Sequence, residues 1–129
     1  MLRWFTPVPT YLRIYKDRMV LRRVDTGGSL DRISSVPFTS DRLLVRDFPA
    51  ASELLNGMLR DVNDRVGIFS RNLQLVIHPM EMMENGLSSV ERRAFLDLGE
   101  HAGAKPVILA DSREELNDAQ ILDLLSERQ

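Results

Sequence analysis

The chain has 129 residues, of which 43% are hydrophobic and 28% charged, a composition typical of one soluble domain. Its 17 basic and 19 acidic residues give a net charge of −2, which argues against nucleic-acid binding, and the lack of cysteine excludes disulfides, cysteine–zinc sites and thiol catalysis. No apolar run approaches the ~20 residues of a membrane-spanning helix, and no signal peptide is recognisable. We therefore expect a single cytoplasmic domain over residues 1–129.

The first third of the chain has the alternating pattern of β-strands. Residues 11–16 place Leu12 and Ile14 on one face, and residues 19–24 follow after only two polar residues, which predicts a hairpin. Residues 25–29 have the composition of a turn. A short strand is expected near residues 33–36, within a stretch that otherwise reads as loop.

A helix and a buried strand are predicted next. Pro49 is expected to open the helix with Asp47 as its cap, because a proline at the first helical position loses no hydrogen bond. Apolar residues then recur at helical spacing as far as Val66, and Gly57 within this stretch indicates close packing against the helix. The apolar run 73–77, which ends at a His-Pro pair, predicts a strand buried on both faces.

The clearest local signal is a capping box at the start of a second helix. Ser88 can accept the N–H of Glu91, whose carboxylate can return to the N–H of Ser88. Gly103 is expected to end this helix.

The last elements complete the expected fold. Residues 107–109 predict a second buried strand, and Asp111 or Ser112 is expected to cap a final helix carrying Leu116, Ala119 and further apolar residues. The pattern predicts an α/β domain with a mixed sheet covered by helices, in the order β-β-β-α-β-α-β-α.

Four side chains near the ends of two predicted strands are candidates for a functional site. His78, Glu81 and Glu84 follow the strand at 73–77, and Asp111 follows the strand at 107–109, so all four could meet at one sheet edge. They could hold a metal or perform acid–base chemistry. Their spacing matches no ligand motif, however, and the alternative is a locally bonded histidine with solvated glutamates. No residue is therefore assigned to catalysis, a cofactor or a metal.

A methionine cluster is the second candidate, and other motifs give no chemistry. Met80, Met82 and Met83 could form an adaptable protein-binding surface, or they could simply fill the core or a loop. His101 suits the last turn of its helix and needs no further role. The glycine pair at 27–28 lacks the spacing of a phosphate loop, and no serine lies in a nucleophile elbow.

Several segments together resemble the motifs of one known family. Residues 73–79 (LQLVIHP), 90–95 (VERRAF) and 102–109 (AGAKPVIL) are similar to the motifs V-V-x-x-V-P, V-E-R-R-A and A-G-A-x-x-V-x-L in the first half of MreB, the bacterial actin homologue of rod shape. Residues 41–48 resemble the segment before its first long helix, and residues 11–24 resemble the hairpin that follows its phosphate loop. The resemblance covers nearly the whole chain and extends to small stand-alone MreB-like proteins. It implies an actin-like, ribonuclease H-like half-fold.

The nucleotide-binding motifs of that family are altered in this chain. Its phosphate-loop motif D-x-G-T corresponds to residues 5–10 (FTPVPT), where two prolines remove N–H donors. Its I-E-E-P motif becomes residues 109–112 (LADS), so only Asp111 could stand in for a catalytic carboxylate. The second half of the family's fold, which completes the ATP site, has no counterpart before Gln129.

The resemblance with these departures implies a bacterial, MreB-like pseudo-ATPase. We expect a non-enzymatic module without cofactor that acts through contacts with another protein or with itself as a homodimer, in connection with cell shape or division. The alternative is a small enzyme or ligand-binding protein, such as a residual ATPase or metal-dependent hydrolase, built on His78, Glu81, Glu84 and Asp111. A nucleotide-binding half completed by a separate partner is a third possibility, which the two prolines disfavour.

Overall fold

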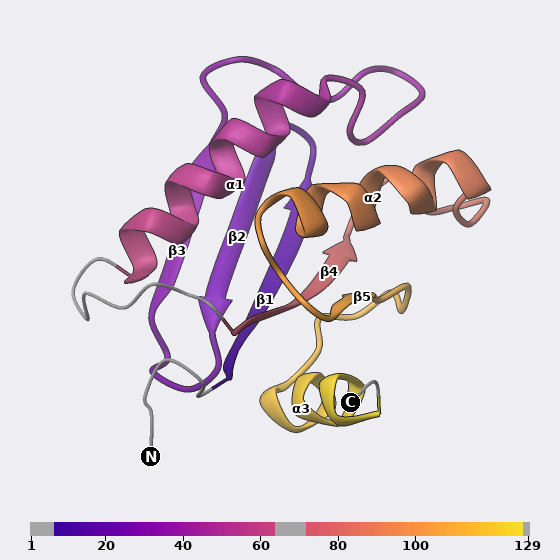
Figure 1. Cartoon of the computed structure of the whole chain (residues 1–129). Coiled ribbons are helices and arrows are strands. Elements are labelled where there is room, and N and C mark those ends of the chain that lie inside the picture. The colour runs from indigo at the N-terminus through magenta and orange to yellow at the C-terminus, as the bar shows by residue number, and fades with distance from the viewer. Residues whose placement is uncertain (1–6, 64–71, 128–129) are drawn as a thin grey trace.

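The computed structural model describes residues 7–63 and 72–127, and Figure 1 shows them as a five-stranded sheet with three helices. The elements in chain order are β1 (Val8–Tyr15), β2 (Arg18–Arg23), β3 (Ser29–Ile33), α1 (Phe48–Asn63), β4 (Leu73–Pro79), α2 (Ser89–His101), β5 (Val107–Leu109) and α3 (Asp118–Ser126). The predicted α/β class and the predicted order of elements are both confirmed.

The sheet is mixed, with the strand order β3-β2-β1-β4-β5. The hairpin partners β1 and β2 are antiparallel, as are β2 and β3, whereas β4 runs parallel to β1 and β5 runs parallel to β4. The carboxyl ends of β1, β4 and β5 therefore meet at one edge of the sheet.

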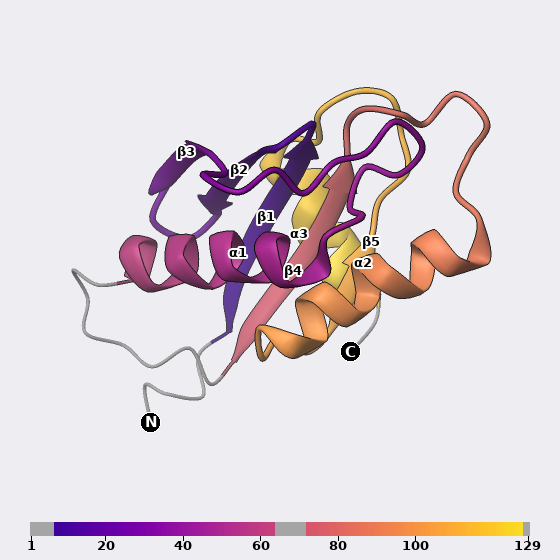
Figure 2. The same ribbon diagram turned by 90° about the horizontal axis from the view of Figure 1, so that it is seen from above.

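The sheet is the middle of three layers. Figure 2 shows α1 and α2 on one face of the sheet and α3 on the other. The larger core lies under α1 and α2, and a smaller one lies under α3; its buried members are Tyr11, Val76, Ala110, Leu116, Ile121 and Leu125.

The predicted hairpin and helix signals are confirmed. The side chain of Asp47 accepts the N–H of Ala50 at 3.0 Å at the start of α1. Ser88 and Glu91 form the complete capping box of α2, with bonds of 3.2 and 3.0 Å. Gly103 follows α2 with a φ of 94°, a conformation that glycine adopts without strain.

The third strand and the last cap differ from the prediction. The strand expected near 33–36 is β3 and begins at Ser29, because the turn after β2 is shorter than its composition indicated. The cap of α3 is Asn117, whose side chain accepts the N–H of Gln120, and not Asp111 or Ser112. Asn117 and Gln120 form a complete capping box. This signal was missed because Asp111 and Ser112, which come earlier in the chain, are also typical cap residues.

The observed burial differs from the prediction at two places in the second half of the fold, the strand β5 and Ala119. The strand β5 is only half-buried because it forms the edge of the sheet and not its centre. Leu116 is buried just before α3, and Ala119 within the helix is exposed. Val66 lies outside the described residues.

Two glycines inside helices have opposite packing environments. A Cβ at Gly99 in α2 would lie 2.7 and 2.9 Å from the two methyl groups of Val107 in β5. A Cβ at Gly57 in α1 would meet only the guanidinium of Arg60, at 3.7 Å. Close packing was expected at Gly57 and is found instead at Gly99.

Alanine at these two glycines should therefore change stability in opposite directions. We expect Gly99→Ala to destabilise the protein by about 1–3 kcal/mol through overpacking against Val107. Gly57→Ala serves as the matched control and should stabilise it by about 0.5–1 kcal/mol through helix propensity. Urea unfolding measures both, and equal stabilisation by the two variants would contradict the close approach of α2 to β5.

Candidate functional site

A hollow of about 460 Å³ lies at the sheet edge where β1, β4 and β5 end. Open α/β sheets bind their ligands at such an edge, because loops from neighbouring parallel strands diverge there. The hollow is lined by Lys16 after β1, by Pro79 and the following residues 80–84 after β4, and by residues 111–113 after β5. Its charged side chains have both signs.

The turn between β1 and β2 closes one side of this hollow, and its backbone donors are already used. The N–H of Lys16 donates to the carboxylate of Glu81 at 2.5 Å. The N–H of Asp17, which has a positive φ of 53°, donates to the hydroxyl of Thr39 at 3.0 Å. Neither N–H is therefore free to bind a phosphate, because that of Lys16 is bonded to the Glu81 carboxylate and that of Asp17 to the Thr39 hydroxyl.

The residues that the resemblance aligns with the phosphate loop do not line this hollow. Val8–Thr10, with Pro9, lie within β1 at the opposite end of that strand from the hollow, while residues 5 and 6 lie outside the described part of the chain. The turn that meets the carboxyl ends of β4 and β5 is Lys16-Asp17. The strand boundary was misplaced because a proline inside a strand reads as a break in the pattern.

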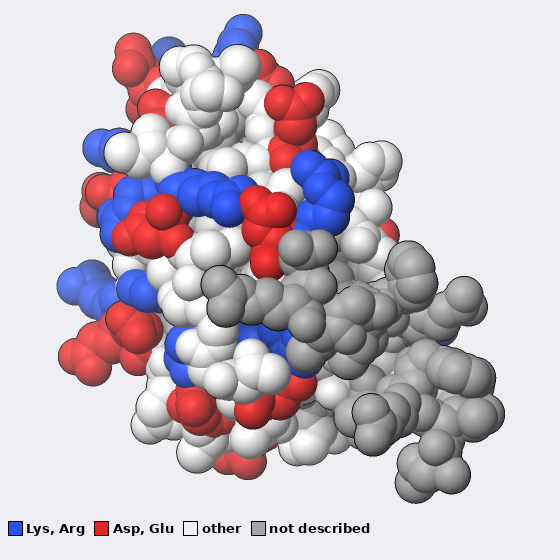
Figure 3. All heavy atoms as spheres, turned by 90° about the vertical axis from the view of Figure 1, so that its left-hand side faces the viewer, with Lys and Arg blue, Asp and Glu red and all other residues white. Residues whose placement is uncertain are grey.

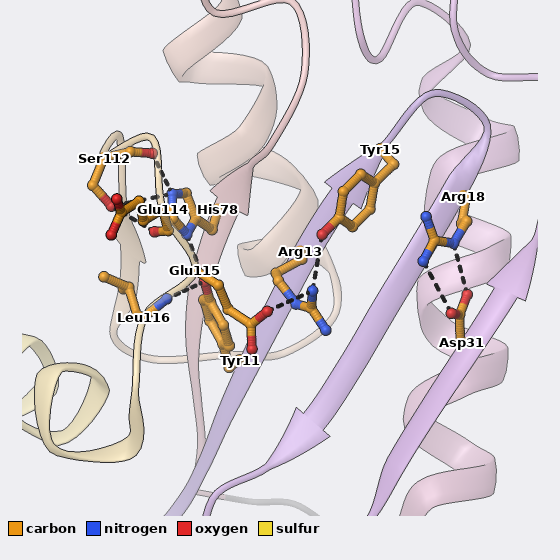
Figure 4. Close-up of polar contacts among 10 residues, drawn as sticks. All are labelled: Tyr11, Arg13, Tyr15, Arg18, Asp31, His78, Ser112, Glu114, Glu115 and Leu116. Atoms are coloured by element: carbon orange, nitrogen blue, oxygen red, sulfur yellow. Dashed lines mark hydrogen bonds and ion pairs between the residues drawn. The ribbon is translucent and has the colours of Figure 1, made fainter.

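His78 does not line the hollow but lies at the centre of a buried hydrogen-bonded line, shown in Figure 4. Its Nδ1 is 2.6 Å from the hydroxyl of Tyr11, and its Nε2 is 2.7 Å from the carbonyl oxygen of Ser112. The Tyr11 oxygen also accepts the N–H of Leu116 at 3.0 Å. The line thus ties β1 and β4 to the segment that leads into α3.

The chemistry of these partners determines the proton positions. The carbonyl of Ser112 can only accept, so Nε2 of His78 carries the hydrogen. In a neutral imidazole Nδ1 is then the acceptor, and the Tyr11 hydroxyl donates to it. Protonation of His78 would add a second donor facing Tyr11 and leave the phenol hydrogen without an acceptor. The network therefore requires a neutral histidine.

Burial favours the same neutral forms. Desolvation lowers the pKa of His78, opposed by the hydrogen bond to Ser112 and by the carboxylates of Asp111 and Glu115, and assisted by the charge of Arg13. Desolvation also raises the pKa of the Tyr11 hydroxyl, opposed by the hydrogen bond from Leu116. Both groups are thus held uncharged between β1, β4 and the α3 segment.

Stability should consequently fall as the solution becomes acidic. The unfolded chain takes up a proton on His78 near pH 6.5, whereas the folded protein resists this until a lower pH. The contribution of His78 is fully present above about pH 6.5 and is lost as the pH falls through its folded pKa. The slope contributed by this one proton is at most ~1.4 kcal/mol per pH unit.

Urea unfolding between pH 7 and pH 5 measures this effect, with the His78→Gln variant as its control. Glutamine does not titrate, so its stability should change less over that interval than that of the natural protein. Equal pH profiles for the two proteins would contradict the neutral, buried histidine.

The structure brings three of the four predicted strand-end residues to one place. Glu81, Glu84 and Asp111 line the hollow, whereas His78 faces Tyr11 on the α3 side of the sheet. Asp111 lies 3.9 Å from Arg92 of α2 in an exposed ion pair. Within the described segments, no three His, Asp or Glu side chains are grouped so that they could hold a metal ion.

The three methionines of the second candidate all line the same hollow and are half-buried. Met82 packs against the larger core and has a positive φ of 61°, which sets the loop after β4 at the hollow's wall. His101, in the last turn of α2, lies edge-on to Phe48 at 6.0 Å between ring centres.

Sequence reasoning missed the roles of Tyr11 and Asp17. Both tyrosine and histidine lie on strands whose pairing register cannot be read from the sequence, so nothing linked Tyr11 to His78. A signal was present at Asp17, since an aspartate in a two-residue hairpin turn tolerates a positive φ and bonds nearby backbone.

The comparisons with known proteins add no relatives. No protein-family model, no curated protein and no solved structure matches the chain. In the described segments, no helix combines the length and the apolar content needed to cross a lipid bilayer.

Proposed function

We propose that the chain is an actin-like, ribonuclease H-like half-fold of the MreB type that has lost nucleotide chemistry and acts as a protein-interaction or scaffold module. The strand order β3-β2-β1-β4-β5 supports this, with β2 alone running against the other four strands. This is the arrangement expected of one half of that fold. The resemblance of residues 73–79, 90–95 and 102–109 to MreB supports a role in cell shape or division.

The observation that carries the loss of nucleotide chemistry is the occupied turn after β1. Phosphate-binding loops offer free backbone N–H groups, usually on glycines, to the anion. Here the turn has no glycine, and the N–H of Lys16 is bonded to the carboxylate of Glu81. A bound phosphate would have to displace this carboxylate or accept its repulsion at close range.

Binding of Mg-ATP tests the proposal directly. A ligand present at 100 times its Kd adds about 2.7 kcal/mol to the stability of the folded state, which raises Tm by several degrees. We expect millimolar Mg-ATP to leave Tm unchanged and to release no phosphate in the presence of the protein. A rise in Tm, or ATP turnover that Asp111→Ala abolishes, would overturn the proposal.

Divalent cations distinguish this proposal from the alternative of a metal-dependent site, which predicts that they raise Tm. We expect Mg²⁺, Mn²⁺ and Zn²⁺ at millimolar concentration to leave Tm and the NMR signals of the His78 ring unchanged, because both ring nitrogens are already hydrogen-bonded. A metal-dependent rise in Tm that Glu81→Gln removes would favour a metal site in the hollow.

A further inference from the structure

The outer edge of β3 offers unpaired backbone groups. The N–H of Arg23 donates to Gly28 and the N–H of Ser34 donates to Asp17, which sets the alternation of bonds between β2 and β3. By that alternation the N–H and C=O groups of Ser29, Asp31 and Ile33 point away from β2. Among the described residues these outward groups have no hydrogen-bond partner. Such an edge is a template for a further strand.

Exposed apolar side chains lie at the end of this same edge. Ile33 is 76% exposed and Val36, three residues further, is 51% exposed. Val90 on α2 is equally exposed at 73%, but it lies on a helix and not at a strand edge. The β3 edge thus combines free backbone donors with apolar surface.

The charges along the edge are neutralised within the chain. Arg18 donates two hydrogen bonds to Asp31, at 2.8 and 3.0 Å, and these hold the pKa of Asp31 below its usual value. Arg32 lies 2.5 Å from Asp61 of α1. Figure 3 shows the side of the molecule where β3 is the outermost strand, and there the two signs are interspersed without a continuous patch. No net charge therefore repels a second copy of the same surface.

We infer that a second copy of this chain adds its own β3 antiparallel to this edge, with Ile33 of the two copies opposite each other. This deepens the proposed function, on which it rests, by naming the partner as the same chain. In this register the outward N–H and C=O groups of the two Ile33 residues bond to each other, and the outward Asp31 and Ser29 of each copy face Ser35 and Pro37, which follow β3 in the other copy.

The side chains select this register among the alternatives. A two-fold axis at Asp31 would place the two Asp31 carboxylates directly opposite each other, and an axis at Arg32 would do the same with two guanidinium groups. With the axis at Ile33, Arg32 faces Ser34, Asp31 faces Ser35, and the two exposed isoleucines cover each other. Like charges are thereby kept apart.

The helix layer allows the two sheets to join. α1 packs over β2 and β3. Because strands are about 4.8 Å apart, a two-fold continuation of the sheet would place the two α1 helices roughly 10 Å apart, which is the usual helix packing distance. The pairing uses the β3 edge of both copies, so it closes as a dimer and does not propagate into a fibre.

Sedimentation across protein concentrations tests the surface. We expect a reversible monomer–dimer equilibrium for the natural protein and a monomer for Ile33→Lys, whose side chain is exposed in the monomer and whose Tm at low concentration should be unchanged. Val90→Lys is the matched control and should dimerise as the natural protein does. A natural protein that stays monomeric at millimolar concentration, or an Ile33→Lys variant that associates equally well, would overturn the inference.

Single cysteines test the register, because the chain has no cysteine of its own. The residue Ile33→Cys lies at the axis and should form an interchain disulfide readily under mild oxidation. Ser29→Cys lies four residues away, so its two copies would be about 27 Å apart and should cross-link at least tenfold more slowly. Equal rates would exclude this pairing.

The two tests separate this inference from the function on which it rests. Binding of Mg-ATP would overturn the loss of nucleotide chemistry whatever the oligomeric state. Dimerisation that Ile33→Lys does not weaken, or binding of a strand from another protein by a monomer, would overturn the paired β3 edge. Neither result would contradict the proposed function as an interaction module.

Discussion

Replacing His78 by alanine is expected to destabilise the protein by about 3–5 kcal/mol. The side chain is fully buried, so its loss leaves a cavity between β4 and the segment before α3. It also leaves the Tyr11 hydroxyl without its acceptor and the Ser112 carbonyl without its donor. The unsatisfied, buried Tyr11 hydroxyl costs about 1–3 kcal/mol, which adds to the cost of the cavity, whereas Ser112 is exposed and its carbonyl can bond to water.

Two further variants keep this prediction testable if His78→Ala does not fold. Tyr11→Phe retains the ring and removes only the hydroxyl, which leaves the Leu116 N–H and His78 Nδ1 unpaired and should cost about 1–3 kcal/mol. In His78→Gln the glutamine side chain offers one acceptor and one donor, so this variant should lose less stability than His78→Ala.

Chemical unfolding of the series measures these effects, with the exposed His101→Ala as control. His101 is exposed and lies edge-on to Phe48, so its loss should cost less than ~1 kcal/mol. In a double-mutant cycle Tyr11→Phe and His78→Gln should be non-additive, because they share one hydrogen bond. Additive effects would show that the buried line does not act as a unit.

The local signals of this fold could be predicted because they depend on neighbours in sequence. The capping box at Ser88, the proline start of α1 and the Gly103 turn use residues within a few positions of one another. The apolar run 73–77 indicated a strand buried on both faces, and β4 is an interior strand that pairs with β1 on one side and β5 on the other. These elements were sufficient for the α/β class.

The site could not be predicted to the same degree because it depends on register. His78 and Glu81 are only three residues apart, yet His78 points under α3 while Glu81 reaches the turn after β1. Alternation along β4 determines which face His78 takes, and the pairing with β1 determines that Tyr11 lies within its reach. Neither the face that His78 takes nor the register with β1 can be read from the three-residue spacing of His78 and Glu81.

Asp17→Ala is expected to destabilise the protein by about 2–4 kcal/mol and to loosen the loop between β3 and α1. One carboxylate oxygen of Asp17 accepts the N–H groups of Phe38 and Thr39, both at 2.8 Å, and its carbonyl accepts the N–H of Ser34 at 2.8 Å. Alanine removes the first two bonds, which are strengthened by the negative charge. It must also adopt a positive φ, which costs about 1 kcal/mol.

The order of the substitutions separates these two causes. Asparagine keeps a side-chain oxygen and tolerates the left-handed conformation, so Asp17→Asn should be the mildest change. Glycine relieves the backbone strain without replacing the acceptor, so Asp17→Gly should fall between asparagine and alanine. Exposed Asp41 has no hydrogen-bonded partner among the described residues, and Asp41→Ala should leave stability unchanged.

Hydrogen exchange identifies where the stability is lost. Phe38 and Leu44 are buried core residues on the loop that Asp17 holds, so the loop opens only if these side chains leave the core. In Asp17→Ala the amides of Phe38 and Thr39 should exchange at least tenfold faster, whereas those in the centre of β4 should reflect only the global change. Uniform acceleration throughout the sheet would show that Asp17 stabilises the whole fold and does not act as the anchor of this loop.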